Sequence, residues 1–76
     1  MNAERRKVLS KAEDLINQAK ELILEAAEGE QEYLDNMPES LQQGDKGERA
    51  GEVADDLVAV ADELEELCNR VSDAQN

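Results

Sequence analysis

Carboxylates are the side chains with the greatest capacity for chemistry in this sequence, which has 20 Asp and Glu, no His and one Cys. Paired carboxylates can serve as general acid and base, but they need a sheltered pocket that shifts their pKa values. Thin helices in a chain of 76 residues offer no such pocket. The sequence also lacks zinc-ligand spacing, a Gly-rich phosphate loop and a calcium-loop pattern. We therefore expect no enzymatic activity, no catalytic residues, no metal and no cofactor.

An acidic surface in the C-terminal half has two interpretations. Its members fall away from the apolar positions of the same segment and include Asp55, Asp56, Asp62 and Glu63. They could form a solvated surface that maintains solubility. They could instead mimic the phosphates of DNA and occupy a basic groove on a nucleic-acid-binding protein.

Basic side chains gather near the start of the sequence, at Arg5, Arg6 and Lys7. In a helical hairpin these groups could pair with Glu65, Glu66 or Asp73 of the neighbouring helix. Alternatively, they could bind an anion such as a nucleotide across an oligomer, together with Arg49. The second interpretation predicts an oligomeric sponge that sequesters a signalling nucleotide.

The junction between the two heptad-patterned halves, residues 32–52, contains the single Pro and the single Tyr. Its large apolar groups could seal the end of a bundle, or they could form a recognition surface carried by a rigid scaffold. The candidate partner-binding residues here are Tyr33, Asp35, Asn36, Met37, Pro38, Glu39 and Leu41.

The run from Tyr33 to Gln42, YLDNMPESLQ, followed by Gly47 and Glu48, resembles a signature of small, acidic, uncharacterised proteins encoded by bacteriophages and prophages. The resemblance covers about residues 28–66. It implies a phage origin more than a mechanism, and small phage proteins of this size often act by stoichiometric binding in the bacterial host cell. Such a protein is expected to inhibit a host defence or nucleic-acid-processing protein.

Two long helices must position these groups. In the first, apolar residues spaced three and four apart predict a helix over residues 3–36, which Pro38 ends. The predicted contact positions are Leu9, Ala12, Ile16, Ala19, Ile23 and Ala26, and the same register continues through Glu30, Tyr33 and Met37.

A turn over residues 37–46 follows, with a short helical turn from Pro38 to Gln43 and Gly44 as its stop. Asp45 and Glu48 have the spacing of a capping box, which predicts that a second helix spans residues 46–72 and frays after Val71. Its predicted contact positions are Ala50, Val53, Leu57, Val60, Leu64, Leu67 and Val71, with Ala54, Ala61 and Cys68 widening the stripe.

These elements predict an all-α fold with one domain over residues 1–76: an antiparallel helical hairpin with a Pro-containing turn. Val8, Leu15 and Leu22 make the apolar stripe of the first helix wider than one partner helix requires. We therefore expect the hairpin to form a homodimeric four-helix bundle or a larger helical oligomer. A structural or regulatory dimer without any ligand is the remaining functional alternative.

The net charge and the cysteine content limit the kinds of partner and the cellular compartment that we expect for this protein. A net charge of −12 disfavours direct binding to nucleic acid or to anionic membranes and favours a host protein with a basic surface. The single Cys68 cannot form an internal disulfide, and no signal peptide follows Met1. We expect a cytoplasmic protein.

Overall fold

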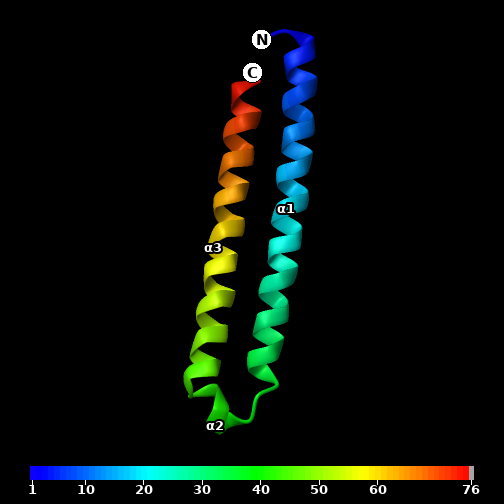
Figure 1. Ribbon diagram of the computed structural model, residues 1–76. Helices are drawn as coiled ribbons and strands as arrows, with labels where there is room; N and C mark the ends of the chain where they lie inside the picture. The colour runs from blue at the N-terminus through cyan, green and yellow to red at the C-terminus, as the bar shows by residue number, and fades with distance from the viewer. Residues whose placement is uncertain (76) are drawn as a thin grey trace.

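The computed structural model describes residues 1–75 and shows a helical hairpin (Figure 1). Helix α1 (Ala3–Asp35) and helix α3 (Asp45–Ala74) run antiparallel, and the short helix α2 (Glu39–Gln42) forms the corner between them. The Cα trace extends 58 Å along its long axis and only 14 and 12 Å across it. The predicted all-α hairpin is confirmed, and the chain is a two-helix rod with a built corner.

Local hydrogen bonds fix both ends of helix α1. The side chain of Asn2 accepts a hydrogen bond from the Arg5 backbone N–H at 2.8 Å and caps the first turn. The helix ends at Asp35, one residue before the predicted end, and the Asn36 N–H closes the last turn on the Glu32 carbonyl at 2.9 Å. Pro38 then starts the α2 turn, because its carbonyl accepts from the N–H groups of Leu41 and Gln42.

The predicted capping box at the start of α3 is wrong. The N-cap residue is Gly44, which makes no side-chain capping bond, and Asp45 is already the first helical residue. Asp45 therefore contributes negative charge near the helix N-terminus and does not cap it. The backbone of Gly44 has φ −89°, so this glycine is not a left-handed helix stop.

Helix α3 continues two residues beyond its predicted end, to Ala74, because the following residue ties it to α1. The Gln75 amide nitrogen donates to the Glu13 carboxylate at 2.6 Å. The Ser10 hydroxyl donates to the Gln75 amide oxygen at 3.3 Å. The predicted fraying from Ser72 onward is therefore wrong as far as Gln75, and Asn76 lies outside the described residues.

Alanines form the most buried part of the contact between α1 and α3. The buried apolar residues among those described are Ala27, Ala50, Ala54 and Ala61. At each of two α3 heptads, the smaller of two adjacent apolar residues faces α1: Ala61 is buried where Val60 is exposed, and Cys68 is half-buried where Leu67 is exposed. The prediction that Val60 and Leu67 contact α1 is therefore wrong. The smaller neighbouring residues occupy the contact because small side chains allow the two helix backbones to approach each other.

The register of α1 also shifts along the helix. Ile16, Ala19 and Ile23 contact α3 as predicted, but Ala27 is buried in place of Ala26. Leu34 likewise replaces Tyr33, which is exposed. A straight α-helix with 3.6 residues per turn drifts by about 20° per heptad from a strict 3.5-residue repeat, so after three heptads the next residue faces the partner.

Helix α2 packs directly on the first turn of α3 at Gly47, which is buried. A Cβ atom added at Gly47 would lie 2.6 Å from the Gln42 Cα, closer than real Cβ atoms approach backbone. Gly51, one turn later, faces the Leu34 side chain instead, at an ordinary contact distance of 3.7 Å from such a Cβ. Only the first of these two glycines is required for the corner to close.

We predict opposite effects for the same substitution at these two glycines. Gly47→Ala should lower the free energy of unfolding by about 1–3 kcal/mol, because α2 must move away from α3. Gly51→Ala should raise it by up to about 1 kcal/mol, because Ala is the better helix former and its methyl group fits beside Leu34. Urea unfolding followed by circular dichroism measures both values at one protein concentration, and equal effects would contradict the described corner.

Candidate functional site

Large apolar side chains lie outside the hairpin core at a regular spacing. On α1, Val8, Leu15 and Leu22 are seven residues apart and each immediately precedes a half-buried residue of the helix contact. On α3, Val60 and Leu67 are also seven apart and immediately precede Ala61 and Cys68, with Val53 one heptad earlier. The exposed fractions of the five exposed residues run from 41% at Val60 to 67% at Val8.

The two sets lie on the same side of the hairpin. In an antiparallel pair of right-handed helices, stepping back one residue from the contact rotates the side chain toward the same side on both helices. Residues that follow the contact position, such as Leu24 and Val58, consequently share the opposite side. They do so here, because Leu24 and Val58 line one groove together with Ala27 and Ala54.

We call the first side the apolar face and define it by Val8, Leu15, Leu22, Val53, Val60 and Leu67. Leu67 joins Leu9, Ile16 and Val71 along a shallow groove between the two helices, which connects the two sets near the open end of the hairpin. Lys7 and Lys11 flank it at the open end, beside Val8 and Leu15. A contiguous apolar surface rimmed by charged groups is typical of a protein interaction site.

The acidic residues predicted to bind a partner all lie on the surface of α3. Asp55, Asp56, Asp62 and Glu63 are all exposed. Asp55 and Asp62 follow contact residues and lie on the side opposite the apolar face, whereas Asp56 and Glu63 precede the half-buried Leu57 and Leu64 and lie beside that face. Among residues 1–75 the ion pair is between Arg49 and Glu52, at 3.8 Å and well exposed. Within residues 1–75, most acidic side chains of α3 therefore form no ion pair with another side chain of the same chain.

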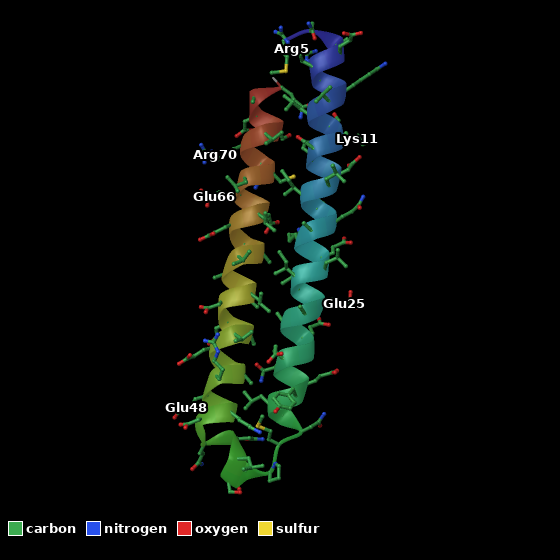
Figure 2. The ribbon with its side chains drawn as sticks, viewed as in Figure 1. Arg5, Lys11, Glu25, Glu48, Glu66 and Arg70 are labelled. Atoms are coloured by element: carbon green, nitrogen blue, oxygen red, sulfur yellow. The ribbon has the colours of Figure 1, made fainter. Side chains whose placement is uncertain are left out.

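The predicted ion pairs from Arg5 and Arg6 to Glu65, Glu66 or Asp73 are wrong for the described residues. The hydrogen bond from Ser10 to Gln75 places Arg5 and Arg6 level with the end of α3. Glu65 and Glu66 lie about ten residues earlier in α3, which corresponds to roughly 15 Å along the helix. Figure 2 shows Glu66 and Arg70 on the side of α3 that points away from α1.

The cations of the predicted anion site do not come together in one chain. Arg5, Arg6 and Lys7 lie at the open end of the hairpin, whereas Arg49 lies near the corner. Arg6 and Lys7 do line a shallow groove with Ser10 and Lys11 along the outside of α1. That groove also contains the carboxylate of Asp14, which opposes anion binding.

The junction residues divide between the core and the surface. Met37 is half-buried, whereas Tyr33 and Leu41 are exposed. The surface residues of the predicted partner-binding set also include Asp35, Asn36, Pro38 and Glu39. The junction therefore seals the end of the hairpin with one large side chain and presents two others to solvent.

Two junction residues outside the predicted set hold the corner together. The Gln42 side-chain amide donates to the Met37 carbonyl at 3.0 Å and to the Asp35 carbonyl at 3.5 Å. Leu34 packs toward Gly51 on α3. An amide at this position carries no sequence signal for that role, because Gln42 reaches these carbonyls only after Pro38 has reversed the chain.

Cys68 is half-buried in the contact between α1 and α3, with its sulfur 3.8 Å from the Glu13 carbonyl oxygen. This agrees with the predicted place of Cys68 in the apolar stripe of the second helix. Within residues 1–75, neither long helix has an apolar stretch of the length that a bilayer requires.

Comparison with protein-family models, with curated proteins and with solved structures finds no match to this chain. The resemblance of the junction to phage-encoded proteins therefore stays a prediction. Functional inference rests on the two surfaces described above, the apolar face and the acidic surface of α3.

Proposed function

We propose that the protein is a non-enzymatic binding module in which two hairpins pair through their apolar faces into a four-helix bundle. The observation that carries this proposal is that the most buried apolar side chains are small, whereas large apolar side chains are exposed. The buried apolar residues of the described hairpin are alanines, while Val8, Leu15, Leu22, Val60 and Leu67 of the apolar face remain 41–67% exposed. Covering a Leu or Val side chain contributes about 1.5–3 kcal/mol, so the stabilisation that this hairpin lacks is available on that face.

A second copy of the chain is the occupant that this face fits. The apolar residues repeat every seven positions on both helices, as knobs-into-holes packing between helix pairs requires. A hairpin of 76 residues buries too little apolar surface to be robust alone, so it needs a partner that is always present. A second copy of the same chain is such a partner, because it is present wherever the protein is present.

Two valines on α3 provide a matched test of this pairing. Val60 and Val58 are exposed to 41% and 43%, but Val60 belongs to the apolar face and Val58 lies on the opposite side. Val60→Glu should therefore abolish the dimer, because it buries an unpaired carboxylate in the interface. Val58→Glu should leave the dimer intact.

Molar mass by sedimentation equilibrium, with circular dichroism on the same samples, measures this difference. A loss of dimer or of helical content in V60E alone supports the proposal. A wild-type protein that is a folded monomer, or a V60E variant with the wild-type molar mass and helix content, contradicts it.

The bundle is proposed to act by stoichiometric binding through its acidic surface to a protein with a basic groove. Asp55 and Asp62 are exposed and follow the buried Ala54 and Ala61, so they lie on the side opposite the apolar face and pairing leaves them accessible. Each chain has a net charge of −12, so two paired chains create a strong negative field, which accelerates association with a basic partner. The junction resemblance favours a host defence or nucleic-acid-processing protein as that partner.

Neutralising the acidic surface should abolish this binding without affecting the dimer. The variant D55N/D62N removes the two charges that lie opposite the apolar face and retains the shape of each side chain. In affinity capture from nuclease-treated bacterial lysate, wild-type protein should retain one partner stoichiometrically, the variant should lose it, and a DNA duplex should displace it. Equal capture by both proteins, or a captured partner that DNA does not displace, would contradict the DNA-mimic function.

The second candidate is a nucleotide sponge, and it is favoured by the groove on α1 that brings together Arg6, Lys7 and Lys11. A nucleotide at about 100 times its dissociation constant should stabilise the native protein by about 2.7 kcal/mol and raise Tm by more than about 5 °C. Thermal unfolding against linear and cyclic nucleotides measures this, with K7Q/K11Q as the control. An unchanged Tm for every nucleotide would eliminate the candidate.

A further inference from the structure

We infer that the two hairpins pair head to tail, so that the corner of each lies beside the open end of the other. This inference rests on the proposed pairing through the apolar face and adds its orientation. It has a functional consequence, because it places the two corners, each with an exposed Tyr33 and Leu41, at opposite ends of one rod.

The charge of the hairpin is strongly uneven along its length. The corner half, residues 21–61, has 12 acidic and two basic side chains, for a net charge of −10. The open half, residues 1–20 and 62–76, has eight acidic and six basic side chains, for a net charge of −2. The sequence-distant segments of the open half lie side by side in the hairpin (Figure 1), so this asymmetry belongs to the folded rod.

The apolar face does not itself select an orientation, because it is centred on the rod. The contact between Glu13 and Cys68 and the approach of Leu34 to Gly51 align the two helices. With that alignment, Leu22 is level with the Val60 region, and Val53 is level with α1 close to residue 30. The face therefore runs from about residue 8 to about residue 30 of a helix that spans Ala3–Asp35. A corner-to-corner pair and a head-to-tail pair would both cover it.

Electrostatics then decides between the two orientations. Corner-to-corner pairing places a charge of −10 against another −10, whereas head-to-tail pairing places each −10 against −2. Packed helices are about 8–10 Å apart, close to the Debye length of about 8 Å at physiological ionic strength, so salt does not remove this repulsion. Lys7 and Lys11, which flank the apolar face at the open end, would lie beside the acidic corner half of the second copy.

The interspin distance in a singly labelled homodimer tests the orientation directly. Cys68→Ala removes the native thiol, and Ser40→Cys adds a nitroxide label at the corner, where Ser40 is exposed. Head-to-tail pairing predicts a distance approaching the 58 Å length of the hairpin. Corner-to-corner pairing predicts about 10–20 Å, since packed helices are about 10 Å apart.

A second label, at Gln18→Cys near the middle of the rod, is the matched control. Its two spins should lie within about 30 Å in either orientation, because the helices pack about 10 Å apart and Gln18 is close to the rod centre. A short distance at Gln18 with a long one at Ser40 supports head-to-tail pairing. Short distances at both positions overturn the orientation while retaining the dimer.

The absence of dipolar coupling at Gln18 overturns the pairing itself, and the orientation with it. Circular dichroism checks that each labelled variant keeps its helical content. Should Cys68→Ala reduce that content, Cys68→Val serves as the background, because it fills the half-buried position with a slightly larger apolar side chain.

Discussion

Close approach of two helix backbones along an alanine contact is the constraint on which this hairpin depends. Ala27 of α1 and Ala50, Ala54 and Ala61 of α3 occupy the most buried positions. Small side chains allow near contact of the backbones but bury little apolar area per residue, so the contact specifies alignment more than it supplies stability. Leu15, Leu22 and Leu67 lie instead on the flank of this contact, and the proposed pairing would cover that flank.

The same constraint shapes the corner. Because α1 and α3 are close, the connection between them must be compact, and α2 folds back against the first turn of α3 at Gly47. Gln42 then secures the reversed chain through the Met37 carbonyl. The corner is thus a rigid end of the rod, and the exposure of Tyr33 and Leu41 on it is a property of a fixed surface.

The apolar face and the acidic surface of α3 have different roles in the proposed function. The apolar face is where another helix pair can dock, while the outer surface carries a large negative charge with one described ion pair, Arg49 with Glu52. Exposed ion pairs contribute little to stability, so this acidic surface does not hold the hairpin together. In the proposed bundle this charge would affect orientation and partner choice, because the acidic halves of two copies repel each other and an acidic surface attracts a basic one.

The sequence by itself determined the helical class, the hairpin and the position of the reversal, because heptad spacing and Pro38 act locally. It also identified both charged clusters. Tertiary structure alone decided which of two adjacent apolar residues faces the partner helix. Sequence periodicity cannot distinguish Val60 from Ala61, since both lie within one broad stripe, and only the close approach of α1 selects the smaller one. The sequence did predict the α1 part of the apolar face, through Val8, Leu15 and Leu22. The place of Val60 and Leu67 on that face, the bonds of Gln75 to α1 and the need for Gly47 follow from the packing, which is why the sequence did not reveal them.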